Sequence, residues 1–317
     1  MKILVTPTSF LKPENREAKE KLERFADEVI YNPFGRPLQA DEIGPLLAGV
    51  DGYIAGLDYI TAEVLEEAPD TLKTISRYGA GVDRVDLPAA KAKGITVTNT
   101  PGTNAVAVCE LAFGMLLGLA RSITRLDKAV RKGEWPRNDG MELKGKTLGI
   151  AGMGAIGKNL AVRARAFEMN VVAYDPWFDE AFGREYGVSS VTFEELLKVS
   201  DAISLHMPLN DATHHIVNAQ ALSTMKDGAI LINTARGGLI DELAAAEALK
   251  SGKLRGLGLD VYETEPVTDS PLIGFDNVVM TPHTGAHTKE AIVGMGVMAV
   301  DNLIAVLKGE KCPYTVK

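Results

Sequence analysis

The chain has 317 residues, of which 46% are apolar and 24% are charged, and this length favours two domains with substantial cores. Its 42 acidic and 34 basic residues give a formal charge of −8, which argues against a broad surface for nucleic acid or anionic lipid. The two cysteines, Cys109 and Cys312, are too few and too far apart for a disulfide framework or a cysteine zinc site. We therefore expect a cytoplasmic protein.

Short β-branched runs alternate with helical patterns along the first hundred residues. Strands are predicted at 3–5, 28–31, 53–55, 73–76 and 95–97, with helices at 13–26, 41–48, 61–68 and just after 86. This βαβ rhythm predicts one parallel α/β layer.

The next part of the chain starts with a long helix, predicted from about Asn104 to Lys132, and then enters a second α/β series. The strands of that series are predicted at 147–151, 170–174, 202–205, 229–233, 256–259 and 277–280, with helices at 155–168, 193–199, 219–225 and 241–251. Six strands with intervening helices suit a doubly wound domain.

A glycine motif typical of dinucleotide binding lies in the middle of the chain. Gly152, Gly154 and Gly157 follow a predicted strand and open a helix, a context in which glycines let the backbone approach a pyrophosphate. Asp175, at the end of the next strand, can accept both hydroxyls of the adenosine ribose. The motif therefore predicts NAD as cofactor, and the alternative is a glycine turn beside a solvated aspartate.

Further segments carry a resemblance to a known family. They are LLKVSDAISLHMP (196–208), MKDG (225–228) with INTARGG (232–238), and LDVYETEP (259–266) with TPHTG (281–285). Together with the glycine motif they make nearly the whole chain similar to the D-isomer-specific 2-hydroxyacid dehydrogenases. The resemblance implies an NAD-dependent oxidoreductase that interconverts a D-2-hydroxy acid and its 2-oxo acid.

The family resemblance also implies an architecture. It is α/β, with two doubly wound parallel-sheet domains, a Rossmann-type nucleotide domain and a flavodoxin-like substrate domain, and a cleft between them. The substrate domain would be discontinuous, comprising 1–99 plus 286–317, and the dinucleotide-binding domain would comprise 100–285. The family further implies a homodimer formed largely through the nucleotide domain and its helix at 104–132.

The chemistry of this reaction needs a cation for the carboxylate, a group that exchanges a proton with the hydroxyl oxygen, and a hydride carrier. By resemblance, Arg236 binds the carboxylate, His283 is the acid/base and Glu265 is its partner. A carboxylate on one imidazole nitrogen would hold the ring in one tautomer and favour its protonated form. Taken alone, each residue is more typical of a solvated loop, so these roles depend on the resemblance.

The resemblance implies further contacts. Those to the cofactor are Gly152, Gly154, Ala155, Ile156, Gly157, Asp175, His206, Pro208, Thr213, Thr234, Ala235, Arg236, Asp260, His283 and Gly285. Those to the substrate are Arg77, Tyr78, Gly79, Ala80, Gly81, Asn104, Arg236 and His283. We expect no metal site, because the histidines show no HExxH spacing.

The substrate is the least specific part of the prediction. Segments 77–83, 98–102, 143–150 and 282–291 resemble the short D-3-phosphoglycerate dehydrogenases. This resemblance implies 3-phosphoglycerate and 3-phosphohydroxypyruvate, a role in serine biosynthesis, and Arg77 and Arg137 as candidate phosphate ligands. Loop 55–58, however, lacks the arginine that such enzymes often place there, so glyoxylate, hydroxypyruvate or another small 2-oxo acid is the alternative.

Two other classes of protein stay open at this point. One is an NAD(H)-sensing binding protein like the corepressors of this fold, and the other is a structural α/β protein with a vestigial glycine loop. A turnover assay separates the first from an enzyme, and failure to bind any dinucleotide would support the second.

Overall fold

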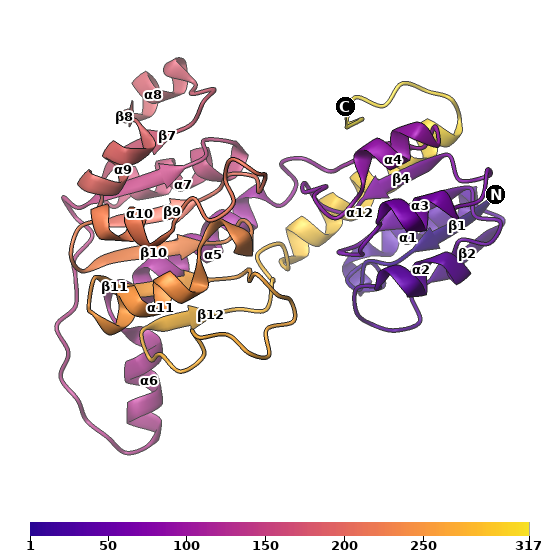
Figure 1. Cartoon of the computed structure of the whole chain (residues 1–317). Coiled ribbons are helices and arrows are strands. Elements are labelled where there is room, and N and C mark those ends of the chain that lie inside the picture. Colours follow the sequence, from indigo (N-terminus) through magenta and orange to yellow (C-terminus); the bar gives the residue numbers. More distant parts are fainter. Residues whose placement is uncertain (317) are drawn as a thin grey trace. The chain divides into compact units, whose positions relative to one another are not determined.

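The computed structural model describes residues 1–316, which form two α/β units, each built around a parallel sheet (Figure 1). Unit 1 comprises residues 1–104 and the segment from 286 onward, and unit 2 comprises residues 105–285. The sequence placed the first boundary at residue 99, whereas in the structure unit 1 ends at Asn104.

Unit 1 contains a five-stranded sheet in the order β2-β1-β3-β4-β5. Its strands are β1 (Lys2–Val5), β2 (Glu28–Tyr31), β3 (Gly52–Ala55), β4 (Thr74–Arg77) and β5 (Thr96–Thr98). Its helices are η1 (Pro13–Asn15), α1 (Arg16–Phe25), α2 (Ala40–Leu46), α3 (Ala62–Glu66), α4 (Leu87–Ala92) and α12 (Lys289–Leu307). This is the flavodoxin-like strand order, in which ligands bind where the order reverses, between β1 and β3.

The C-terminal helix α12 covers one face of the unit 1 sheet. A Cβ on Gly52 would lie 3.1 Å from Leu303 and from Leu307, and the Ser76 hydroxyl donates to the Ala299 carbonyl at 2.8 Å. With 19 residues and high hydropathy, α12 is long and apolar enough to cross a membrane by length and composition alone. Because α12 packs on β3 and β4, its apolar composition is that of a core helix.

Unit 2 contains a seven-stranded sheet in the order β12-β11-β10-β9-β6-β7-β8. Its strands are β6 (Thr147–Ala151), β7 (Asn170–Tyr174), β8 (Val188–Ser190), β9 (Ala202–Leu205), β10 (Ala229–Asn233), β11 (Leu254–Leu259) and β12 (Val278–Met280). Its helices are α5 (Ala105–Ala120), α6 (Ile123–Arg131), α7 (Ala155–Ala166), α8 (Glu180–Tyr186), α9 (Phe193–Val199), α10 (Ala219–Thr224), η2 (Gly237–Leu239) and α11 (Glu242–Lys250). The order reverses between β6 and β9, so the carboxyl ends of these two strands mark the expected ligand edge.

The α/β class with two parallel sheets is confirmed, but several elements of unit 2 differ from the sequence prediction. Helix α8 and the edge strand β8 were not predicted. Only one of the three residues of β8 is buried, so this strand lacks the apolar run that marks its neighbours. The helix predicted over 104–132 is wrong as one helix: it breaks into α5 and α6, which meet at 62°. Ser122, with φ +53°, lies at the break, where the chain leaves the buried surroundings of α5.

Candidate active site

The glycine loop between β6 and α7 is tightly packed at two positions and open at the third. A Cβ on Gly152, which has φ +100°, would lie 2.6 Å from the His206 carbonyl, and one on Gly157 would lie 2.2 Å from the Gly152 oxygen. At Gly154, none of the described atoms lies within 4 Å of the Cβ position. The N-terminus of α7, which begins with Ala155 and Ile156, therefore carries an open backbone surface that suits an anion.

Asp175 follows β7 and contacts this same loop. One carboxylate oxygen accepts the Met153 backbone N–H at 2.6 Å, and the other accepts the Trp177 N–H at 2.8 Å. The side chain of Asp175 therefore helps to shape the glycine loop, in addition to the ribose contact that the sequence predicts. A carboxylate oxygen has two lone pairs, so both oxygens can still accept a further hydroxyl.

Two buried polar atoms lie at the carboxyl ends of β9 and β10, which are paired in the sheet. The His206 imidazole shares a 2.9 Å hydrogen bond with Ser204 through Nε2, while its Nδ1 and the Thr234 hydroxyl have no partner within the described part of the chain. Burial lowers the pKa of His206 to about 4, so this ring is neutral at pH 7. Buried polar atoms of this kind are normally hydrogen-bonded, and a ligand at this edge would supply the partners.

The segment after β9 is closed by local hydrogen bonds. The Thr213 hydroxyl donates to the Pro208 carbonyl at 2.7 Å and accepts the Asn210 N–H at 2.9 Å. Pro208 and Thr213, both predicted as cofactor contacts, are thereby held on one loop of unit 2.

Arg236 follows β10 in a loop fixed by a buried asparagine. The Asn233 amide donates to the Arg236 carbonyl at 2.7 Å and accepts the Ala235 N–H at 3.0 Å. A Cβ on Gly237 would lie 1.9 Å from the Tyr262 backbone, so only glycine fits beside Arg236. The sequence analysis did not single out Asn233, and the available signal was a polar residue ending an apolar strand.

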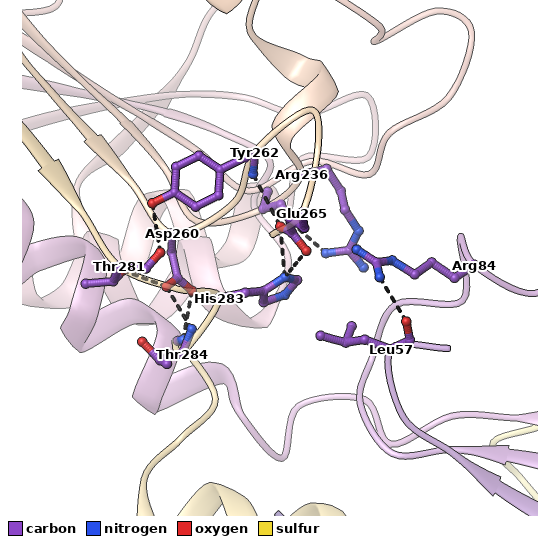
Figure 2. Close-up of polar contacts among 11 residues, drawn as sticks. Leu57, Arg84, Arg236, Asp260, Tyr262, Glu265, Thr281, His283 and Thr284 are labelled. Carbon is purple, nitrogen blue, oxygen red and sulfur yellow. Dashed lines mark hydrogen bonds and ion pairs between the residues drawn. The ribbon is translucent and has the colours of Figure 1, made fainter. Parts of the chain in front are cut away.

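His283 and Glu265 form the pair that the sequence predicts (Figure 2). The His283 Nδ1 lies 2.9 Å and 3.1 Å from the two carboxylate oxygens of Glu265. Because an ionised carboxylate only accepts, Nδ1 carries the proton and Nε2 is the ring nitrogen left for proton exchange. Figure 2 shows Arg236 next to this pair, so unit 2 brings the three residues together.

Asp260 shapes the turn that carries His283. Its buried carboxylate accepts the Thr281 hydroxyl at 2.6 Å and the backbone N–H groups of Thr284 and Gly285, each at 2.8 Å (Figure 2). Its carbonyl accepts the His283 N–H at 2.9 Å. His283 has φ +52°, a conformation that non-glycine residues adopt only where the surroundings impose it.

Tyr262 also stabilises the turn that carries His283. Its hydroxyl donates to the Thr281 carbonyl at 2.9 Å, and its N–H donates to Glu265 at 3.3 Å. Burial and the nearby charge of Asp260 raise the pKa of Tyr262 to about 12, so the phenol remains a donor. Tyr262 is a second residue that the sequence analysis missed.

The predicted substrate residues other than Arg236 and His283 lie in unit 1. Arg77 is buried and its Nη1 donates to the Ala55 carbonyl at 3.3 Å and to the Tyr78 carbonyl. Gly79 lies against this guanidinium, with a hypothetical Cβ 3.1 Å from Nη1. Ala80 is exposed, whereas Gly81 and Asn104 are half-buried.

Two further predictions concern Arg137 and the absence of a metal site. Arg137 is exposed on the loop after α6. Within residues 1–316, no group of three or more His, Cys, Asp or Glu side chains is placed to hold a metal ion.

Comparison with known proteins gives consistent matches. Residues 113–285 match the family model described as "D-isomer specific 2-hydroxyacid dehydrogenase, NAD binding domain". The chain is 45% identical over 254 residues to a D-3-phosphoglycerate dehydrogenase of Methanocaldococcus jannaschii, covering 79% of this chain but only 48% of that protein, about half its length. It is also 45% identical over 272 residues to a hydroxypyruvate reductase of Thermotoga maritima, covering 84% and 88% of the two chains. Among solved structures, the TT0316 protein of Thermus thermophilus superposes with a TM-score of 0.89 at 39% identity, covering 100% of both chains.

Proposed function

The chain belongs to the D-isomer specific 2-hydroxyacid dehydrogenases, a family of NAD-binding enzymes, and from this we propose that it interconverts a D-2-hydroxy acid and its 2-oxo acid. The observation that carries the proposal is the His283–Glu265 pair, 2.9 Å apart, in the same unit as the glycine loop. A paired imidazole and a dinucleotide site are the two parts that hydride transfer to a carbonyl needs.

The residues of unit 2 fit NAD. The open backbone at Gly154 and the N-terminus of α7 would hold the pyrophosphate, and Asp175 would accept the adenosine ribose hydroxyls. The Thr234 hydroxyl and the His206 Nδ1, both buried without a partner in the described chain, would gain one from a ligand at this edge. When bound, NAD carries the hydride to or from C2 of the substrate.

The protein's own part in the reaction is to bind the substrate and to move one proton. Arg236 presents a planar guanidinium that binds the substrate carboxylate through two parallel hydrogen bonds. In reduction, the His283 Nε2–H gives its proton to the carbonyl oxygen, and in oxidation the neutral Nε2 takes the hydroxyl proton. Glu265 keeps the other proton on Nδ1, which orients the ring and stabilises its charge when both nitrogens are protonated.

A turnover assay tests this function. Purified protein is mixed with NADH and a panel of 2-oxo acids, and loss of NADH absorbance is followed. Turnover with at least one 2-oxo acid supports the dehydrogenase. NADH binding without turnover of any of them would contradict it and would favour the NAD(H)-sensing class.

For the substrate, we propose 3-phosphoglycerate and 3-phosphohydroxypyruvate, which would place the enzyme in serine biosynthesis. The support is the unit 1 segment 77–83, which resembles D-3-phosphoglycerate dehydrogenases. Sequence identity does not separate the candidates, because a D-3-phosphoglycerate dehydrogenase and a hydroxypyruvate reductase are both 45% identical to the chain. A phosphate group needs cations near it, and Arg77 and Arg137 are the candidates.

A second candidate is a small unphosphorylated 2-oxo acid, such as hydroxypyruvate or glyoxylate. It is favoured by the burial of Arg77, whose guanidinium hydrogen-bonds backbone carbonyls of its own unit, and by Ala55 in the loop where an arginine is expected. Comparing kcat/KM for phosphohydroxypyruvate, hydroxypyruvate, glyoxylate and pyruvate decides between the two. A preference for the phosphate ester of less than about tenfold over hydroxypyruvate, roughly 1.4 kcal/mol, would contradict the first candidate.

We also propose that the protein is a homodimer that uses the apolar face of α6. Ile123 and Val130 are 55% and 50% exposed, and they line a shallow groove together with Leu126. α6, which the structure describes in full, has no buried residue, and in Figure 1 it projects from the rest of unit 2. An amphipathic helix with an uncovered apolar face fits a second copy of itself.

The oligomeric state tests the dimer directly. Light scattering on a sizing column should give the mass of two chains. The double variant Ile123→Glu with Val130→Glu should give one chain, whereas Lys128→Glu, on the same helix, should remain a dimer. A monomeric unmodified protein would contradict the proposal.

The buried free thiols of Cys109 and Cys312 further support the reducing cytoplasm that we propose as its location.

A further inference from the structure

Asp58 is a carboxylate enclosed within unit 1, with only 1% of the residue exposed. It accepts the Tyr53 hydroxyl at 2.9 Å, the Gly56 N–H at 2.9 Å and the Leu38 N–H at 2.8 Å, and the Thr6 hydroxyl also donates to it. Burying a carboxylate is costly unless its oxygens are hydrogen-bonded, and these four donors meet that requirement. Four hydrogen-bond donors thus fix the position of the Asp58 carboxylate.

The donors come from separate loops of the chain. Thr6 follows β1, Leu38 precedes α2, and Gly56 follows β3. The loops after β1 and β3 also contact each other directly, because the Gly56 N–H donates to the Thr6 hydroxyl at 3.0 Å and a Cβ on Gly56 would lie 3.1 Å from Pro7. The carboxyl ends of β1 and β3 are the point where the strand order of this sheet reverses, which is where open α/β sheets bind ligands.

The loop that Asp58 organises is in turn bonded to the loop after β4. The Ala55 carbonyl accepts the Tyr78 N–H at 2.9 Å and the Arg77 Nη1 at 3.3 Å. A shift of loop 55–58 would therefore displace loop 77–81, whose residues the family resemblance implies as substrate contacts.

Arg84, three residues beyond loop 77–81, forms a second connection to loop 55–58. Its Nη1 donates to the Leu57 carbonyl at 2.8 Å (Figure 2), and its guanidinium lies 4.6 Å from the centre of the Tyr59 ring. Leu57 and Tyr59 flank Asp58 in the chain, so the position of the Arg84 charge also depends on this carboxylate.

We infer that Asp58 is a positioning residue for the 2-oxo acid, which holds loop 55–58 and, through it, loop 77–81 in the arrangement that binds substrate. The inference rests on the proposed function. Asp58 is enclosed and acts through its neighbours, so it is not itself a catalytic residue. Its removal should weaken substrate binding and leave the NAD site, which belongs to unit 2, unchanged.

The test variant is Asp58→Asn, which nearly keeps the size but places an NH₂ group against donors. The KM for the 2-oxo acid should rise by about tenfold, the size expected for the loss of a hydrogen bond to a buried charge. kcat should change by less than about threefold, because His283 and Arg236 are untouched. The Kd for NADH, followed by the fluorescence of Trp177 in a Trp135→Phe background, should stay the same.

Thr74→Val is the matched control. The Thr74 hydroxyl is a buried donor in the same sheet, to the Thr96 carbonyl at 2.9 Å, but it lies at the start of β4, at the opposite edge from these loops. This variant should lower the unfolding temperature and leave KM unchanged. An unchanged KM in Asp58→Asn, or an equal rise in the Kd for NADH, would overturn the inference.

A second variant keeps the test valid if Asp58→Asn does not fold. Tyr53→Phe removes one of the four donors and keeps the carboxylate, so the KM should rise by about threefold. An unchanged KM in this variant would count against the inference in the same way. If the unmodified protein turns over no 2-oxo acid, the proposed function fails. If the protein is active but its KM is unchanged in both variants, only the inference about Asp58 fails.

Discussion

The carboxylate of Asp175 accepts the backbone N–H of Met153, at 2.6 Å, from inside the glycine loop. The residue that we propose selects the ribose therefore also stabilises the loop that we propose binds the pyrophosphate. A change at Asp175 alters both properties, and experiments on cofactor choice have to separate them.

We predict that NAD exceeds NADP by at least about tenfold in kcat/KM, because the 2′-phosphate would meet the charge of Asp175. Asp175→Ala should narrow this gap but also raise the KM for NAD, since the Met153 N–H loses its acceptor. Asp175→Asn, which keeps an acceptor oxygen and loses the charge, should narrow the gap with a smaller loss of NAD binding. Equal use of both cofactors by the unmodified protein would refute this.

The glycines of the loop should separate binding from stability. Gly154→Ala adds a methyl group where none of the described atoms lies within 4 Å, so the unfolding temperature should hold while the Kd for NADH rises by about tenfold or more. Gly157→Ala places a methyl group 2.2 Å from the Gly152 oxygen and should lower the unfolding temperature. Thermal unfolding and NADH titration of both variants check this. A stable Gly154→Ala that binds NADH normally would show that the pyrophosphate lies elsewhere.

Substitutions at His283 and at Glu265 should lower kcat to different extents. His283→Ala removes the group that we propose exchanges the proton, and it should lower kcat by about 10²–10⁴-fold with little change in the Kd for NADH. Glu265→Gln leaves an amide oxygen that can still accept the Nδ1–H, so kcat should fall by about tenfold, roughly 1.4 kcal/mol. Steady-state kinetics measure both. Near-normal kcat in His283→Ala would mean that another group carries the proton.

His206 should make the stability of the fold depend on pH. Burial lowers its pKa from 6.5 to about 4, so below pH 6.5 the unfolded chain binds a proton that the folded chain does not. Between pH 7 and pH 5 this group alone should reduce the free energy of unfolding by about 2 kcal/mol.

Urea unfolding of the unmodified protein and of His206→Asn at both pH values isolates this contribution. The unmodified protein should lose about 2 kcal/mol more than the variant on going from pH 7 to pH 5. An identical loss in both would show that the imidazole is not shielded from solvent.

Much of the fold could be predicted from local pattern. Strands such as β10, Ala-Ile-Leu-Ile-Asn, read as apolar runs because helices cover both faces of a parallel sheet. The glycine loop was recognisable because its spacing reflects close packing within a few residues. The break at Ser122 was not, because neither glycine nor proline stands at it and the end of α5 is set by what packs around that helix.

The candidate site divides in the same way. Arg236, Glu265 and His283 came from a family motif, and their catalytic roles remain predictions that the kinetics above will test. Asn233 bonds only within its own loop, and its place at the end of an apolar strand was a usable signal. Asp58 could not be found from the sequence, because its importance lies in hydrogen bonds to other loops. Asp58 bonds to Thr6 and Leu38, segments that are distant in the chain and meet only in the folded sheet.

The return of α12 to unit 1 determines the order in which the two units can be completed on the ribosome. Domains nearer the N-terminus usually fold first during synthesis. Here, unit 2 has been synthesised in full before the residues that cover Gly52 and Ser76 have been made. One apolar face of the unit 1 sheet therefore stays uncovered until the last segment of the chain has been made. A chain truncated after residue 285 would contain all of unit 2 but would lack the helix that completes unit 1.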